Sequence, residues 1–170
     1  MTLSEIRRSA IEPALALLPA KMSSQQAEVM LLAIGLQESR FVHRRQIKGP
    51  ARSFWQAEKG GGMVHGIARH HLTEFLALAV ADARGVAPVN DDQVYIAIEH
   101  DDVLAAALAR LLLWTDPFKL PAEHDVEGAW QLYLRTWRPG AHSRGTQQQK
   151  DELRAKWARN YAAAIREVYR

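Results

Sequence analysis

Residues Ala27–Glu38 read AEVMLLAIGLQE, and this stretch decides the fold. Apolar residues fill so many consecutive positions that a helix built from them has almost no polar face, which is typical of a helix buried at the centre of a domain. Ser23 and Ser24 precede the stretch, and a serine there can cap the first turn of a helix with its hydroxyl. We therefore expect a buried central helix that ends near Glu38.

Helical periodicity extends over most of the remaining chain. Helices are expected at residues 3–18, 67–83, 91–98, 101–114, 126–137 and about 146–169. The segment Arg40–Gly62 lacks periodicity and contains Gly49-Pro50 and three consecutive glycines, so we expect a long loop with room for a small β-hairpin. The length of 170 residues, with 48% hydrophobic residues, suits one globular domain. We predict an all-α, or α-dominated, single domain that spans residues 1–170.

The composition argues against several classes of protein. The chain has no cysteine, which excludes disulfide scaffolds, Cys-ligated zinc sites, iron–sulfur clusters and thiol nucleophiles. His65, His70 and His71 lie close together in the sequence, but no His-Glu-x-x-His motif is present. We therefore expect neither a metal nor a cofactor.

The sequence shows no segment that would insert into a membrane. No apolar run approaches the roughly 20 residues that a bilayer-spanning helix needs. Near the N-terminus, Glu12 and Pro13 interrupt the apolar run that follows Arg8, unlike the core of a signal peptide. We expect no transmembrane segment and no signal peptide.

The charge is unevenly distributed. The formal net charge is only +3, yet residues 135–170 contain nine Lys or Arg against three Asp or Glu. Residues 40–59 form a second basic stretch, with six Lys or Arg and one acid, Glu58. Either stretch could contact an anionic polymer.

Glu38 is the residue most suggestive of chemistry. It stands at the end of the most apolar helix, directly before the basic, glycine-containing loop. A carboxyl group held in an apolar wall has a raised pKa, which suits a general acid that works near neutral pH. Position alone leaves a second interpretation open, in which Glu38 is a solvated helix-end residue paired with Arg40 or Arg44.

The residues around Glu38 form a longer pattern, LQESRF at Leu36–Phe41 followed by GPARSFWQ at Gly49–Gln56, with 18 positions from the glutamate to the glutamine. The pattern resembles the lysozyme-like superfamily of lytic transglycosylases and goose-type lysozymes. Their signature is Glu-Ser at the end of a buried helix, followed by Gly-Ala-x-Gly-(Leu/Phe)-(Met/Trp)-Gln. A variant in phage cell-wall lytic proteins, Gly-Pro-Ala-Arg-Gly-Phe-Trp-Gln-x-Glu, is the most similar. The resemblance covers Ala33–Gly66, about a fifth of the chain.

This resemblance implies a lysozyme-like domain that cleaves the β-1,4 bond between N-acetylmuramic acid and N-acetylglucosamine in peptidoglycan. Glu38 would be the general acid of lytic transglycosylation, which yields a 1,6-anhydro product, or of hydrolysis. The partner would be the peptidoglycan glycan strand. The resemblance further implies a monomeric phage endolysin or virion-associated muramidase. It would be made in the bacterial cytoplasm and reach the periplasmic wall after holin-type release or as a virion component.

Three polar residues join Glu38 as candidates on the same resemblance. Ser39 and Gln56 are expected to bind substrate, because relatives use an amide at the position of Gln56 to hold the substrate beside the acid. Glu58 follows two positions later and is the candidate for a second catalytic carboxylate, which could activate water opposite the acid. The alternative for Glu58 is a salt bridge to Arg52 or Lys59.

Aromatic residues supply the remaining substrate-binding candidates. Phe54, Trp55 and Trp137 could stack on sugar faces, although we expect at least one of them to belong to the core. Tyr133 lies in the late helix, where it could reach into the cleft or pack as an ordinary core aromatic.

The chain also departs from the family pattern. Ser53 replaces the usual glycine, so we expect a less left-handed turn before Phe54. The family segments Asn-Ile-x-x-Gly-x-x-Tyr-Leu and Ala-Tyr-Asn-Ala-Gly are missing near residues 102–112 and 129–133. Weaker similarity to the end of phage lysozyme-like domains is present at Gly128–Gly140. A phage-type enzyme therefore fits better than a bacterial transglycosylase.

A non-enzymatic alternative remains open at this point. The basic C-terminal helix at about residues 146–169 could serve a helical virion or binding module that contacts nucleic acid or another partner. The aromatic and basic pattern of a known nucleic-acid-binding fold is absent, so nucleic acid is not expected to be an obligate partner.

Overall fold

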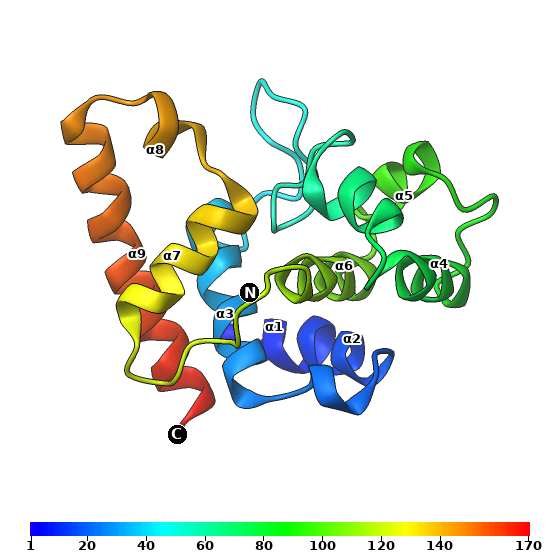
Figure 1. Cartoon of the computed structure of the whole chain (residues 1–170), viewed down its shortest axis with the longest axis horizontal. Coiled ribbons are helices and arrows are strands. Elements are labelled where there is room, and N and C mark those ends of the chain that lie inside the picture. The colour runs from blue at the N-terminus through cyan, green and yellow to red at the C-terminus, as the bar shows by residue number, and fades with distance from the viewer.

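Helix α3 (Gln25–Glu38) lies at the centre of the molecule, as the apolar stretch predicts (Figure 1). A computed structural model describes all residues, 1–170. The hydroxyl of Ser24 accepts a hydrogen bond from the backbone N–H of Ala27 at 3.1 Å, so Ser24 and not Ser23 is the cap. Nine of the 14 residues of α3 are buried, which confirms the prediction of a buried central helix.

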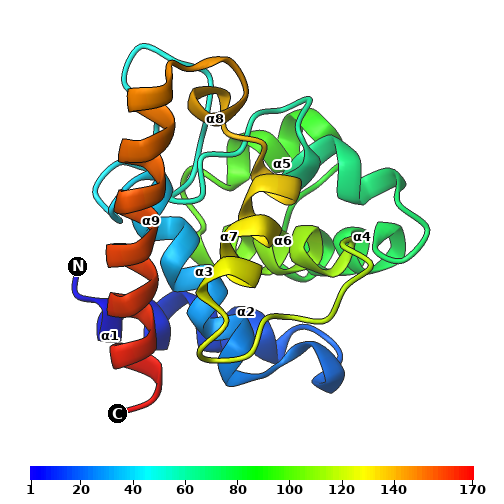
Figure 2. The same ribbon diagram turned by 60° about the vertical axis from the view of Figure 1, so that its left-hand side comes forward.

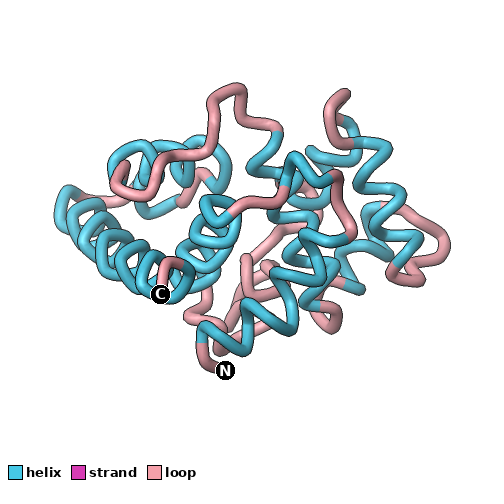
Figure 3. Tube along the Cα trace, turned by 90° about the horizontal axis from the view of Figure 1, so that it is seen from below, coloured by secondary structure: helices cyan, strands magenta, loops and turns pink.

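The protein is all-helical, with 64% helix and no sheet, and this confirms the predicted fold class (Figure 3). The α-helices are α1 (Leu3–Ile6), α2 (Glu12–Ala16), α3, α4 (Glu74–Ala83), α5 (Asp91–Ala97), α6 (Asp102–Trp114), α7 (Val126–Trp137), α8 (Gly140–Arg144) and α9 (Gln147–Val168). Four short π or 3₁₀ segments connect them: η1 (Arg7–Ile11), η2 (Ala20–Met22), η3 (Gly62–Gly66) and η4 (Ile67–Arg69). None of these helices combines the length and the apolar character that a membrane span requires.

The C-terminal helix is part of the core. Figures 1 and 2 show α9 lying along α3, and the two helices are in contact. Thr146 and Gln149 form the capping box that the sequence predicts at the start of α9. Trp157, in the middle of α9, is completely buried. One face of the basic helix is therefore used for packing.

Two predicted boundaries are wrong. The helix expected over residues 67–83 is interrupted before α4, because the buried hydroxyl of Thr73 donates to the carbonyl of Ile67 at 2.8 Å and the chain is extended at His70. The polar segment after Trp137, expected to be a loop, contains the short helix α8. Five residues are too few to show an apolar period.

The segment between α3 and η3 is a loop, as expected, but it contains no hairpin with regular strands. Only two isolated antiparallel bridges are present, between Arg45 and Arg52 and between Arg52 and Ala57. The chain turns sharply between them, with positive φ at Lys48, Ser53 and Gln56. This loop folds over the C-terminal end of α3 and forms one wall of a cleft.

Candidate active site

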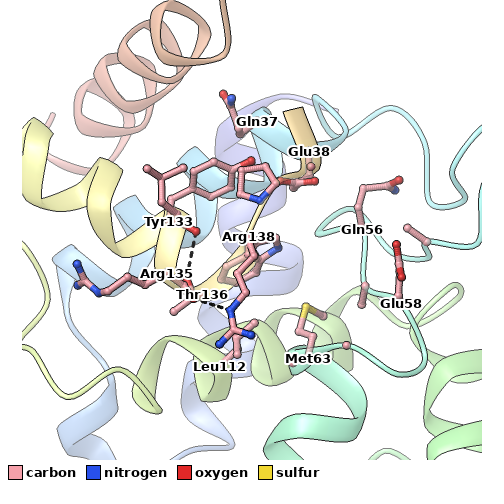
Figure 4. Close-up of a pocket in the computed structure, with 18 of the residues that line it drawn as sticks. Gln37, Glu38, Gln56, Glu58, Met63, Leu112, Tyr133, Arg135, Thr136 and Arg138 are labelled. Carbon is pink, nitrogen blue, oxygen red and sulfur yellow. Dashed lines mark hydrogen bonds between the residues drawn. The ribbon is translucent and has the colours of Figure 1, made fainter. Parts of the chain in front are cut away.

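An open cleft of about 1700 Å³ lies at the C-terminal end of α3. One wall comes from α7, α8 and the start of α9, and the other from the loop after α3 and from η3. Figure 4 shows Glu38 and Tyr133 on one side of the cleft, with Gln56 and Glu58 on the other. The cleft thus brings together four of the residues that the sequence singles out.

Glu38 is the last residue of α3, and its side chain is mostly withdrawn from solvent. Burial raises the pKa of Glu38 to about 7, against the opposing effects of a hydrogen bond from Tyr133 and the charge of Lys156. Glu38 forms no ion pair with Arg40 or Arg44, so the alternative of a solvated, paired helix-end residue is wrong. At neutral pH a substantial share of Glu38 carries a proton.

Tyr133 both packs in the core and reaches the cleft, so the two interpretations offered for it hold together. The residue is 1% exposed, and its ring stacks on Trp157 with ring centroids 4.8 Å apart and an angle of 15° between the planes. Its hydroxyl donates a hydrogen bond to Oε1 of Glu38 at 2.7 Å. Burial and the Glu38 carboxylate both raise the pKa of Tyr133, so it stays a proton-bearing donor.

Helix α9 holds the end of α3 through a group of polar contacts. Lys156 donates through Nζ to the carbonyl of Gln37. The side chain of Gln37 donates to the carbonyl of Leu153 at 3.3 Å and accepts from Nδ2 of Asn160 at 2.8 Å. Neither Lys156 nor Asn160 is predictable from the sequence, because no local motif links a position on α9 to one on α3.

Gln56 and Ser39 line the cleft, but the amide nitrogen of Gln56 and the hydroxyl of Ser39 already have partners in the protein. The amide Nε2 of Gln56 donates to the carbonyls of Ser53, at 2.7 Å, and His43, at 3.2 Å, so its oxygen is the atom available to a ligand. The hydroxyl of Ser39 donates to the carbonyl of Gly35 at 3.3 Å and accepts from the N–H of Phe41 at 3.1 Å. Ser39 therefore shapes the turn after Glu38.

The prediction that Phe54 and Trp55 stack on sugars is wrong. Their exposed fractions are 1% and 0%, and the Trp55 indole donates to the carbonyl of Leu31, inside α3, at 2.9 Å. Both rings pack edge-on against Phe41. The aromatic part of the motif therefore fixes the loop to the central helix. Trp137 is the candidate that does line the cleft, where its indole donates to the carbonyl of Trp55 at 2.9 Å.

Gly35 shows why the loop can pack so closely on α3. A Cβ at this position would overlap the ring of Phe41. Because glycine lacks that atom, the ring lies directly on the helix backbone one turn before Glu38.

The turn before Phe54 is fully left-handed, contrary to expectation. Ser53 has a φ of 66°, although serine replaces the glycine of the family pattern. Its buried hydroxyl accepts a hydrogen bond from the N–H of Trp55 at 3.2 Å, which supports the turn. A serine therefore occupies the left-handed position of this turn.

Glu58 is exposed on the opposite wall of the cleft. The salt bridges suggested for it are absent, because each suggested partner pairs elsewhere. Arg52 lies 3.3 Å from Glu99, and Lys59 lies 2.7 Å from Asp92. Glu58 is therefore a carboxylate without an ion-pair partner in the cleft.

No family model, curated protein or solved structure matches this chain. The lysozyme-like resemblance thus stays a prediction from the motif around Glu38. The function has to be inferred from the residues of the cleft.

Most of the basic loop does not offer free charge to a polymer, contrary to the expectation for residues 40–59. Arg44 pairs with Asp102 at 2.7 Å, and both Arg45 and Arg52 lie within 4 Å of Glu99. Arg40 lines the cleft and is the arginine of this stretch without an ion pair.

The clustered histidines make contacts of other kinds. His65 bonds to Asp91 at 2.7 Å through Nδ1, and His70 stacks on His71 with centroids 4.7 Å apart. No group of three or more His, Asp or Glu side chains is arranged to hold a metal ion.

Proposed function

We propose that this protein is a peptidoglycan-degrading glycosidase in which Glu38 is the general acid. One observation carries the proposal. A glutamate whose pKa burial raises to about 7 stands in an open cleft, with a tyrosine hydroxyl holding one of its oxygens. Such a carboxyl group is partly protonated at neutral pH and can give that proton to a glycosidic oxygen. The motif around Glu38 supports peptidoglycan as the polymer.

The first step is common to both chemistries. Glu38 protonates the oxygen of the β-1,4 bond, the bond to the anomeric carbon breaks, and an N-acetylglucosamine end leaves as an alcohol. The Tyr133 hydroxyl donates to the carboxylate that Glu38 becomes, so it stabilises the product state of this transfer. The substrate's own N-acetyl group can assist at the anomeric carbon.

The second step decides the product. In lytic transglycosylation, the Glu38 carboxylate takes the proton of the muramoyl 6-hydroxyl, whose oxygen then closes a 1,6-anhydro ring. In hydrolysis, water replaces that hydroxyl and a reducing end forms. Glu58 lies on the opposite side of the cleft (Figure 4), where a carboxylate could take the proton of that water.

The test compares the natural chain with Glu38→Gln on purified sacculi, with soluble muropeptides measured by mass spectrometry. We expect release to fall by about 10²–10⁴-fold, because the amide keeps the size of the side chain and cannot donate the proton. Glu152→Gln is the matched control, since Glu152 is exposed on α9 and does not line the cleft. Circular dichroism establishes that each variant is folded.

Two outcomes count against the proposal. Equal release by folded Glu38→Gln would remove Glu38 from the reaction. No release by the folded natural chain would favour the non-enzymatic alternative, a binding module that uses basic helix α9.

A further inference from the structure

The charges that line the cleft are unbalanced. Its cations are Arg40, Arg135, Arg138, Arg144 and Lys156, and its acids are Glu38, Glu58 and Asp116. Arg135 and Asp116 neutralise each other at 2.7 Å. Lys156 is turned to the carbonyl of Gln37. Arg40, Arg138 and Arg144 then remain against two acids, Glu38 and Glu58. Partial protonation of Glu38 at neutral pH makes the excess of positive charge larger still.

Three arginines of the cleft therefore have guanidinium groups without an acidic partner: Arg40, Arg138 and Arg144. This sets them apart from the arginines of the neighbouring loop, which pair with Asp102 or Glu99. All three are exposed, and they come from the ends of α3, α7 and α8. Arg40 is two positions beyond Glu38, and Arg138 is five beyond Tyr133.

The backbone holds two of these arginines in a conformation that disfavours them. Arg40 has a φ of 55° and Arg138 a φ of 49°, in the left-handed region where glycine is the usual residue. Non-glycine residues kept in this region tend to cluster at functional sites. The Nε of Arg138 donates to the carbonyl of Arg135 at 3.2 Å, which leaves its two terminal nitrogens for a ligand. Figure 4 shows Arg138 in the middle of the cleft, between Tyr133 and Met63.

We propose that Arg40, Arg138 and Arg144 bind carboxylates attached to the glycan strand, so that the cleft selects an anionic glycan over a neutral one. A guanidinium offers parallel N–H groups that match the two oxygens of a carboxylate. The sugar rings of the strand are neutral and need no such partner. This inference rests on the proposed function, and the carboxylates of its polymer are those of the peptide stem or, where the stem has been removed, that of the lactyl group.

Binding is measured separately from cleavage. The full chain with Glu38→Gln is incubated with purified sacculi and with the same sacculi after carbodiimide and ammonia have converted their carboxylates to amides. We expect about 10-fold tighter binding to the untreated sacculi at low salt. The difference should shrink as salt rises, because the arginines are exposed.

Two double variants in the same background assign the preference. Arg138→Gln/Arg144→Gln should remove most of the preference for untreated sacculi. Glutamine is chosen because it removes the charge and keeps a non-glycine residue at the left-handed position 138. Arg159→Gln/Arg166→Gln removes the same charge from exposed residues of α9 outside the cleft and should retain the preference. Competition by muropeptides with an intact stem, against glycan strands stripped to the lactyl group, identifies which carboxylate is bound.

The outcomes separate this inference from the proposed function. Equal binding to native and amidated sacculi overturns the inference, as does an equal loss in the two double variants, which would mean that net charge alone acts. If the natural chain releases muropeptides but shows no preference for untreated sacculi, or loses the preference equally in both double variants, the glycosidase proposal stands and the arginine site fails. If the preference depends on the two cleft arginines but no muropeptide is released, the carboxylate site stands and the glycosidase proposal fails.

Discussion

The hydroxyl of Tyr133 lies 2.7 Å from Oε1 of Glu38, although the two residues are 95 positions apart in the sequence. This contact joins the end of α3 to the middle of α7, at the edge of the cleft. A hydrogen bond to the carboxylate favours the charged form of Glu38, while burial favours the neutral form. Burial is the larger effect, so the pKa of Glu38 is raised to about 7.

Tyr133→Phe should shift the pH dependence of the reaction. Without the hydroxyl, the Glu38 carboxylate loses a donor and its pKa rises further. The pH at which muropeptide release declines should then move upward by about one unit. Turnover at the optimum should fall, because the deprotonated acid is less stable. An unchanged pH profile in a folded Tyr133→Phe protein would contradict the coupling of these two residues.

Lys156→Met should act in the same direction through charge. The ammonium of Lys156 lowers the pKa of Glu38, so its loss should raise that pKa and extend activity to higher pH. The measurement is again release against pH, at low and high salt. Lys150→Met, which changes a lysine at the start of α9 outside the cleft, is the control and should leave the profile in place. A shift of equal size in both variants would indicate a general charge effect.

Glu38→Gln should make the protein more stable, but only above acidic pH. Folding raises the pKa of Glu38 from 4.5 to about 7, so the folded state holds this proton more tightly than the unfolded chain. The free energy of unfolding therefore falls as pH rises through that interval, by about 3 kcal/mol from this group. The glutamine of the variant does not titrate, so its free energy of unfolding does not fall in this way. Urea unfolding should give equal stabilities near pH 4 and a more stable variant at pH 8, and a constant difference would contradict the buried acid.

Glu58→Gln should distinguish the two second steps. If water is the nucleophile and Glu58 its base, the variant should lose release to a similar extent as Glu38→Gln, and natural products should carry reducing ends. If the muramoyl 6-hydroxyl attacks, products are lighter by one water and the variant should retain most activity. Mass spectrometry measures both the mass of the released products and their amount. Severe loss together with anhydro products would contradict both routes.

The local sequence pattern was sufficient to predict the secondary structure around the site. The apolar run of residues 27–36 predicts a buried helix because no polar face remains to meet water. Its cap at Ser24, the capping box at Thr146, the bounds of α7 and the loop after Glu38 follow from residues within a few positions of each other. The same run places Glu38 at an apolar boundary, so its raised pKa could be expected from the sequence.

Contacts between distant segments decided the rest of the site. The sequence pattern could not tell that Phe54 and Trp55 are buried between their own loop and α3, because an aromatic residue at that spacing suits a sugar face as well as a core. The pattern also could not decide whether Glu58 is a free carboxylate in the cleft or one half of an ion pair. Only the fold brings Glu99 and Asp92 to the basic side chains that Glu58 was expected to pair with.

The sequence by itself determined an all-helical chain with a glutamate at the end of its most apolar helix, because helix periodicity and apolar content act over a few turns. The tertiary structure alone decided what surrounds that glutamate. Tyr133 and Lys156 reach Glu38 because α9 packs along α3 and α7 packs on α9. Burial and through-space charge depend on which segments meet in three dimensions, and they set the pKa on which the proposed chemistry depends.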